Sequence, residues 1–252
     1  MVARSSVLVS VLFACLFVVL TAGEAKAAAP AWCGEGTEAL PSDVCYIDGR
    51  ASTAGRKTLV IWLHGVIAKD TAMSHAHEKM LARIAKATNI EMLFPKGVPG
   101  DQLVAWPGTA DAQAKQEAAL IEQWMVAKAQ LEKRENKSFD ETFIFGFSSG
   151  AYFASSLALR GRADVDGYAV FAGGQAGVKG TDASTHFAPV YVGVCTNDPT
   201  GTAKHARAFA GSLSAAGIPR MVNEQAVGHD ISPTHFLGAL AYLRSKKPIA
   251  RA

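Results

Sequence analysis

Apolar residues along the chain gather in two kinds of stretch, and the two kinds alternate. Short apolar runs rich in β-branched and aromatic residues are typical of strands buried on both faces, whereas longer stretches with apolar residues every three or four positions are typical of helices. No internal repeat or low-complexity linker interrupts the alternation. The pattern predicts one α/β domain, a doubly wound and mostly parallel sheet with helices on both faces. After an extended piece at 44–47, the predicted strands are 58–63, 90–94, 142–145, 167–171, 189–195 and 220–223, and the predicted helices are 72–87, 112–133, 150–160, 203–216 and 232–246.

The N-terminal segment has the pattern of a secretory signal peptide. Arg4 supplies a short positive region, residues 7–20 form an almost unbroken apolar run, and Ala25-Lys26-Ala27 offers the small residues that signal peptidase requires. The run is too short to span a bilayer comfortably, so export and cleavage is preferred to a membrane anchor. We expect a signal peptide at 1–27 and a single mature domain at 28–252. The mature protein should be secreted or periplasmic, with no stable membrane insertion.

Cleavage would remove one cysteine and leave three. Cys33 and Cys45 lie close together in a segment with little periodic pattern, and in an oxidising compartment they are the natural disulfide pair. Cys195 lies inside an apolar run and is expected to be a buried small side chain. Cys15 is a loose match to a lipoprotein signal, and lipidation there stays open as the alternative to cleavage after Ala27.

Composition and charge narrow the possible partners. The chain is 49% hydrophobic and 19% charged, which favours a well-buried core and argues against disorder. The net charge is only +3, and basic pairs such as Arg56-Lys57 are too short to form a nucleic-acid surface. Lys133-Arg134 is flanked by glutamates, as on the solvated face of a helix. No nucleic-acid partner is predicted.

The pentapeptide Gly146-Phe147-Ser148-Ser149-Gly150 matches the pattern G-x-S-x-G. Alone the pattern is weak, because glycine and serine are common in this chain. Its context is specific: a strand ends directly before it and a helix begins within it, and the sharp turn between them needs small residues on both sides. The sequence therefore predicts that Ser148 is a nucleophile, against the alternative of a structural turn with an idle serine.

A serine hydroxyl becomes a nucleophile when a base removes its proton, and a third group must orient that base. In this fold the order along the chain is serine, acid, histidine. His229 follows a short strand in a loop before the last helix, where a base would reach the carboxyl edge of the sheet. His186, in a polar loop, is the second choice. His205 and His235 lie inside predicted helices and are assigned to the surface or to packing.

Two aspartates could orient the histidine. Asp198 stands just past the strand 189–195, at the edge where catalytic groups collect in α/β sheets. The alternative for Asp198 is an ordinary turn residue before Pro199. Asp230 is adjacent to His229, but neighbouring side chains generally point apart. Asp198 is the predicted acid.

A serine mechanism also needs donors for the oxyanion that forms on the substrate. We predict the backbone N–H of Ser149, immediately after the nucleophile, and that of Val66, in the loop after the first long strand. Gly65 would let that backbone turn. His64 precedes the nucleophile in the chain, so a loop-holding role is assigned to it.

Four segments together, Leu63-His64-Gly65, 146–150, Thr196-Asn197-Asp198 and Gly228-His229, resemble the landmark segments of α/β-hydrolases. The pattern is most similar to the polyhydroxybutyrate depolymerase and feruloyl esterase group, and the likeness runs from about Thr58 to the end of the last helix. For that group the resemblance implies hydrolysis of carboxylic esters, small or polymeric, without a cofactor. The sequence departs from the group after the His-Gly pair, where the group usually carries more glycine or cysteine and this chain has Val66-Ile67-Ala68.

The spacing of the later strands leaves little room for a lid. Only seventeen residues separate the strand ending at Phe171 from the one beginning at Pro189, enough for a loop, so no large lid is predicted and an open site is expected. Trp106 either lines that site or packs on the domain. His75 and His77 do not share a helix face, so a polar helix surface is preferred to a metal site and no metal is expected.

Two other functions remain compatible with the sequence. A non-catalytic exported binding module could keep the hydrolase fold, although the nucleophile, acid and base all occur in the expected order. A secreted serine peptidase would use the same three residues, although peptidases of this fold generally carry caps or extra domains for which this chain has little space.

Overall fold

The computed structural model describes residues 32–41, 44–50, 55–73, 77–175 and 187–246. The predicted signal peptide at 1–27, with Cys15, lies outside the described residues. His75 and His186 also lie outside them. So do residues 176–186, which make up most of the connection that we expected to be too short for a lid.

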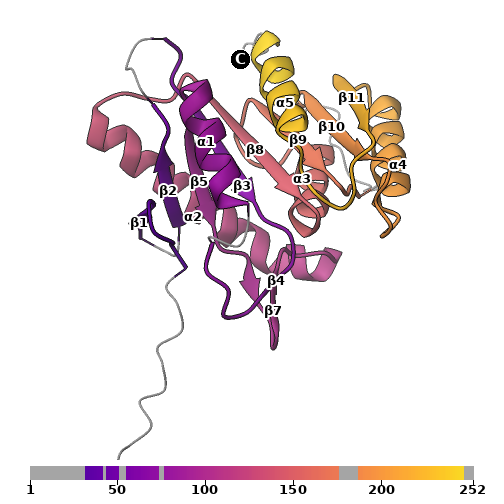
Figure 1. Cartoon of the computed structure of the whole chain (residues 1–252), viewed down its shortest axis with the longest axis horizontal. Coiled ribbons are helices and arrows are strands. Elements are labelled where there is room, and N and C mark those ends of the chain that lie inside the picture. The colour runs from indigo at the N-terminus through magenta and orange to yellow at the C-terminus, as the bar shows by residue number, and fades with distance from the viewer. Residues whose placement is uncertain (1–31, 42–43, 51–54, 74–76, 176–186, 247–252) are drawn as a thin grey trace, which may run out of the picture.

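Among the described residues, eight strands form one sheet in the order β1-β2-β5-β3-β8-β9-β10-β11 (Figure 1). Strand β2 runs antiparallel to β1 and β5, and every other neighbouring pair is parallel. The five consecutive strands from β5 to β10 in this order are buried along their whole length, as their continuous apolar runs predict. The strands are β1 (Glu38–Leu40), β2 (Val44–Asp48), β3 (Thr58–Leu63), β5 (Glu91–Pro95), β8 (Glu141–Phe147), β9 (Gly167–Phe171), β10 (Val190–Cys195) and β11 (Arg220–Gln225).

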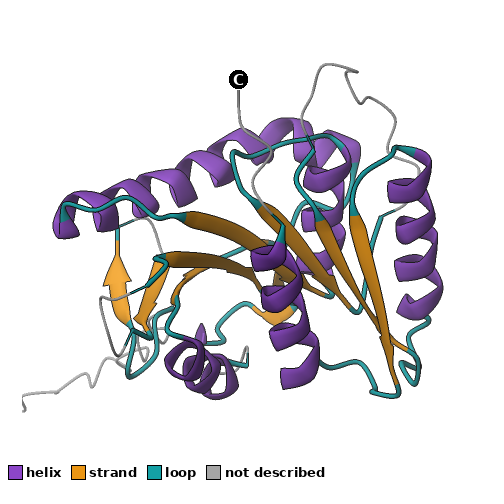
Figure 2. Ribbon diagram, turned by 90° about the horizontal axis from the view of Figure 1, so that it is seen from above, coloured by secondary structure: helices purple, strands orange, loops and turns teal. Residues whose placement is uncertain are grey.

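Helices cover both faces of the sheet (Figure 2). Helices α1 (Glu78–Thr88) and α5 (Pro233–Ser245) bury their apolar sides in one core cluster. Helices α2 (Ala110–Glu135), α3 (Ser149–Leu159) and α4 (Thr202–Ala215) do so in a second cluster on the opposite face. This arrangement confirms the predicted doubly wound α/β fold. Among the described residues, no helix combines the length and the apolar character needed to cross a bilayer.

A second, three-stranded sheet was not predicted. It consists of β4 (Ile67–Ala68), β7 (Leu103–Ala105) and β6 (Val98–Pro99), all antiparallel. Strands of two or three residues are too short to show an alternating pattern, so the sequence carries no usable signal for them. This sheet supports the loop after β3 and leads directly into Trp106.

Helix α1 begins later than predicted. We expected a helix from residue 72, but the helix begins at Glu78, after His77 in the left-handed conformation with φ 68°. A non-glycine residue at positive φ cannot continue a right-handed helix, so the polar helix surface predicted for His77 is wrong. Helix α2 is longer than predicted because it is capped at both ends. The Thr109 side chain accepts from Ala112 N, and Asn136 adopts the left-handed conformation at the C-terminus.

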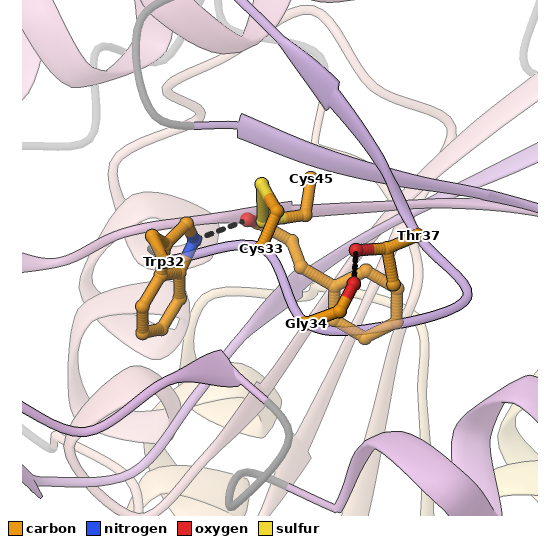
Figure 3. Close-up of a disulfide and its surroundings, with 6 residues drawn as sticks. Trp32, Cys33, Gly34, Thr37 and Cys45 are labelled. Carbon is orange, nitrogen blue, oxygen red and sulfur yellow. Dashed lines mark hydrogen bonds between the residues drawn. A yellow bond between two sulfur atoms is a disulfide. The ribbon is translucent and has the colours of Figure 1, made fainter. Parts of the chain in front are cut away.

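The expected disulfide between Cys33 and Cys45 is present and ties the start of the described chain to β2 (Figure 3). Next to it, the Trp32 indole donates to the carbonyl oxygen of Phe94 on β5 at 3.0 Å. The Trp32 ring also packs against the His64 ring, with 5.3 Å between ring centres. The disulfide therefore fixes a segment that supports the loop after β3.

Removing this disulfide should lower the free energy of unfolding by about 3 kcal/mol, the value expected for a crosslink that closes a loop of this size. The two cysteines are 12 positions apart. The measurement is a urea titration of the oxidised protein, the reduced protein and the Cys33→Ala/Cys45→Ala variant. Equal midpoints for all three would show that the crosslink adds no stability.

Candidate active site

The turns that follow β8, β10 and β11 meet at the carboxyl edge of the sheet. Ser148 follows β8, Asp198 follows β10 and His229 follows β11. Parallel pairing of β8 with β9, β9 with β10, and β10 with β11 brings these three turns side by side. Three residues spread over eighty positions of sequence are thus gathered in one place, as expected for an open α/β sheet.

Ser148 lies at a tight turn between β8 and α3. Its backbone has φ 50° and ψ −116°, a conformation that non-glycine residues rarely adopt. Its N–H donates to the Phe171 carbonyl at 3.0 Å. The two flanking glycines have no room for a side chain: a Cβ at Gly146 would lie 2.3 Å from the Gly150 carbonyl oxygen, and a Cβ at Gly150 would lie 2.2 Å from that of Leu63. The close approach of these backbones explains the spacing of the pentapeptide.

The side chains of Ser148, His229 and Asp198 form a continuous hydrogen-bonded chain. His229 Nε2 lies 2.9 Å from Ser148 Oγ, and His229 Nδ1 lies 2.6 Å from Asp198 Oδ2. Because a carboxylate only accepts, Nδ1 carries the proton and donates it to Asp198. Nε2 is then free to accept from the serine hydroxyl. This arrangement can remove a proton from Ser148.

Asp198 is held as a carboxylate by its surroundings. Its side chain is fully buried, and Oδ1 accepts from Thr200 N at 2.8 Å and from Thr200 Oγ1 at 2.6 Å. Thr202 Oγ1 donates to the other oxygen. Burial alone would raise the pKa of the carboxyl, but the hydrogen bonds from Thr200, Thr202 and His229 outweigh it and hold the pKa of Asp198 well below its usual range. Asp198 is therefore negatively charged beside His229.

Asp230 faces a different partner. Its Oδ1 accepts from Ile231 N at 2.7 Å and lies 3.0 Å from His77 Nε2. The His77 ring packs edge-on against Phe147, and the Phe147 ring also packs against that of His229. Asp230 and His77 thus brace the outside of the loop that carries His229, and the Asp230 carboxylate makes no hydrogen bond to the His229 ring.

The loop after β3 lies against Ser148. A Cβ at Gly65 would lie 3.3 Å from Ser148 Cβ. His64 is buried, with Nδ1 at 2.5 Å from the Gly65 carbonyl and Nε2 accepting from Gly97 N at 3.0 Å. Burial lowers the pKa of His64 to about 4, so the ring is neutral. The Trp106 indole and Gly150 N both donate to the His64 carbonyl. These contacts agree with the loop-holding role expected of His64.

A cavity of about 500 Å³ opens beside Ser148. Trp106 is buried and also borders this cavity, so it both lines the site and packs on the domain. Sequence reasoning missed Tyr152 and Gln175, and it treated His205 only as a surface or packing residue. Tyr152 lies one turn after the nucleophile, which could have marked it, but nothing in the sequence marks Gln175. The lining residues are Val66, Trp106, Gly108, Ser148, Ser149, Tyr152, Gly174, Gln175 and His205.

The remaining candidates are placed away from the cavity. His235 is fully buried in α5, with its ring against Phe171. Cys195 is buried, its thiol donates to the Asp230 carbonyl, and burial raises its pKa to about 11, so it is not a reactive thiolate. Within the described ranges, no group of three His, Cys, Asp or Glu side chains could hold a metal ion.

Solved structures with the same fold include several esterases. The structure of YahD with malic acid is 17% identical, with a TM-score of 0.62 over 81% of this chain and 99% of that one. A carboxylesterase from Mesorhizobium loti is 19% identical, with a TM-score of 0.61 over 84% of this chain and all of that one. A carboxylesterase from Bacillus cereus is 16% identical, with a TM-score of 0.58 over 80% of this chain and 92% of that one. At these identities the likeness establishes the α/β-hydrolase fold.

The sequence itself also matches a known family. No curated protein matches the chain, and the resemblance to the polyhydroxybutyrate depolymerase and feruloyl esterase group is not confirmed. The profile of the dienelactone hydrolase family matches residues 102–229, a segment that includes Ser148, Asp198 and His229. This match spans half of the chain and ends at the candidate base. The chain belongs to the dienelactone hydrolase family of the α/β-hydrolase superfamily.

Proposed function

We propose that this protein is an exported serine esterase that hydrolyses carboxylic esters through a covalent acyl-enzyme. The observation that carries the proposal is the hydrogen-bonded chain from Ser148 Oγ through His229 to Asp198, with distances of 2.9 and 2.6 Å. These are the distances at which a base can take a serine proton and a carboxylate can orient the base. The cavity beside Ser148 offers room for a substrate.

The proposed reaction proceeds in two halves. Ser148 Oγ attacks the ester carbonyl carbon while His229 Nε2 takes its proton, which gives a tetrahedral intermediate and an imidazolium stabilised by Asp198. The imidazolium then protonates the leaving alcohol as the C–O bond breaks, and the acyl group stays on Ser148. A water molecule, deprotonated by His229, attacks the acyl-enzyme and releases the acid and the free serine. The chemistry needs no cofactor.

The negative oxygen of the intermediate requires fixed donors. We assign these to the backbone N–H of Ser149, at the start of α3, and of Val66, in the loop after β3. Both residues border the cavity, and the contact between Gly65 and Ser148 keeps the loop at the nucleophile. The Ser149 hydroxyl itself accepts from Trp106 N at 3.0 Å, so we assign its side chain to holding the loop and not to a second nucleophile.

We further propose that a signal peptide at 1–27 directs export and that 28–252 is a single mature domain, secreted or periplasmic. The disulfide Cys33–Cys45 supports an oxidising compartment. Ester substrates, whether small or polymeric, are the only partners that the proposed site requires.

A panel of nitrophenyl esters of graded acyl length, with a fluorophosphonate probe and a peptide nitroanilide alongside, tests the proposal. We expect labelling by the probe, hydrolysis of esters and at least a hundredfold lower kcat/KM for the anilide. If the probe does not label the protein and no ester is hydrolysed, the protein is a binding module that keeps the hydrolase fold. Equal rates on the anilide and the esters would identify a peptidase.

A further inference from the structure

The two outer strands of the main sheet differ in length. Strand β1 has three residues, whereas β11 has six and pairs with β10 in an unbroken register. Proteins commonly protect a long outer strand with lysine, proline or a bulge, and β11 contains none of these. Among the described residues, no strand pairs with the outer side of β11. That side is therefore a row of backbone groups on which another strand can pair.

The hydrogen bonds to β10 show which backbone groups of β11 face outward. The carbonyl oxygens of Pro219 and Gln225 accept from backbone N–H groups of β10 and of the residue after it, at 2.9 Å each. Along a strand, the N–H and C=O of successive residues point to opposite sides, so the odd-numbered residues face β10. The N–H and C=O groups of Arg220, Val222 and Glu224 therefore point away from the sheet.

The side chains of these three residues form a short charged and apolar row. Because side chains alternate between the faces of a strand, Arg220, Val222 and Glu224 share one face. All three are exposed, and Val222 keeps 41% of its surface accessible. Glu224 already pairs with Arg207 of α4, but its side chain is 44% exposed and can accept from a second cation. An apolar side chain thus stands midway between opposite charges.

We propose that β11 is the interface of a two-fold symmetric dimer, in which it pairs antiparallel with β11 of a second copy of this chain. In an antiparallel pair, two opposite residues that both face the interface exchange two hydrogen bonds. With Val222 on the two-fold axis, Arg220 lies opposite Glu224 of the second copy, and symmetry repeats this pair. The dimer satisfies the outward backbone groups of all three residues and pairs their charges.

Charge also selects the register. The outward groups recur every second residue, so one strand can slide against the other only in steps of two. A slide of two residues places Arg220 and Glu224 opposite uncharged residues. A slide of four places Arg220 opposite Arg220, or Glu224 opposite Glu224, which is unfavourable. The register centred on Val222 is the one that pairs both charges, and this self-complementarity identifies the occupant as a second copy.

The proposed dimer would affect the candidate site indirectly. Strand β11 leads into the loop that carries His229, so pairing on its outer side would hold that strand from both sides. Because the two copies of β11 run in opposite directions, the carboxyl edges of the two sheets, with their Ser148 turns, would face opposite ways. The dimer does not depend on the proposed esterase reaction.

The mass of the purified protein, measured by light scattering and sedimentation from nanomolar to high micromolar concentrations, tests the proposal. We expect a dimer that dissociates on dilution. Val222→Pro removes an N–H that faces outward and that β10 does not use, so the variant should fold and remain monomeric. Val222→Thr keeps the N–H and the branched side chain and should dimerise as the wild type does. Circular dichroism should be the same for all three proteins.

Charge reversals test the register. Arg220→Glu and Glu224→Arg each place like charges opposite one another at two points, so each variant alone should dimerise about tenfold more weakly or worse. Mixed in equal amounts, they restore both opposite-charge pairs and should form a heterodimer, which native mass spectrometry detects. Lys79→Glu makes a similar charge change at an exposed position of α1 and should dimerise as the wild type does.

Three results would overturn the proposal. The first is a wild-type protein that stays monomeric at every concentration. The second is a folded Val222→Pro variant that dimerises as tightly as the wild type, which would locate the interface elsewhere. The third is a mixture of the two charge variants that forms a heterodimer no tighter than their homodimers, which would exclude the register centred on Val222.

Discussion

Replacing Ser148 with alanine should abolish ester hydrolysis and fluorophosphonate labelling while leaving the fold intact. Alanine removes Oγ, the atom that forms the covalent bond, and keeps the backbone of the turn. Loss of the nucleophile in a serine hydrolase lowers kcat by a factor on the order of 10⁶. The measurements are initial rates on a nitrophenyl ester and the intact mass of the protein after treatment with the probe. Circular dichroism and the melting temperature should match those of the wild type.

Ser149→Ala is the matched control for Ser148→Ala. The Ser149 side chain accepts from Trp106 N, and only its backbone N–H is assigned to the reaction, so alanine should leave labelling in place and lower turnover modestly. If the Ser148→Ala variant still forms the phosphonate adduct, and peptide mapping locates it on Ser149, the assignment of the nucleophile is wrong.

Asp198→Asn should lower kcat by about 10⁴, the cost of the equivalent change in a serine protease. An asparagine amide turned toward His229 would donate to Nδ1, so Nδ1 would lose its proton and Nε2 would carry one and be unable to accept from Ser148. The carboxylate that stabilises the imidazolium would also be gone. Thr200 and Thr202 donate hydrogen bonds to both oxygens of the Asp198 carboxylate. An asparagine amide has only one oxygen to accept them, so the variant should also be somewhat less stable. Rates on one ester, measured after each protein is shown to be folded, give the comparison.

Asp230→Asn is the counterpart, because Asp230 is the other acid near His229. Its side chain is 66% exposed and its partner is His77, so the loss of charge should change kcat by a few-fold at most. The contrast between the two variants is the diagnostic result. A severe loss in Asp230→Asn with a mild one in Asp198→Asn would reverse the assignment of the acid.

Most of the sheet could be predicted because its signal is local. The inner strands are continuous apolar runs, and each lies within two residues of its predicted ends. The start of α1 could not be predicted, because His77 takes a left-handed conformation while packing on Phe147, a contact between residues seventy positions apart. The small sheet of β4, β6 and β7 is too short for any periodic signal.

The candidate site shows the same limit. Ser148 could be proposed as the nucleophile because glycine spacing and a strand-to-helix change surround it. Asp198 and His229 could be proposed as its partners because each follows a strand. Gln175 has no such mark. Its place beside the cavity results from the three-dimensional fold, and sequence spacing does not report that.

The disulfide lies in a different part of the sequence from the candidate catalytic side chains. The family match covers residues 102–229, which hold Ser148, Asp198 and His229, and leaves out the disulfide, Trp32 and His64. Those unmatched residues support the loop after β3: Trp32 packs on His64, and His64 in turn holds the backbone that faces Ser148. The side chains proposed for the chemistry and the groups that brace the loop thus lie in separate stretches of sequence. Removing the disulfide therefore changes the support of the loop after β3 without changing Ser148, Asp198 or His229.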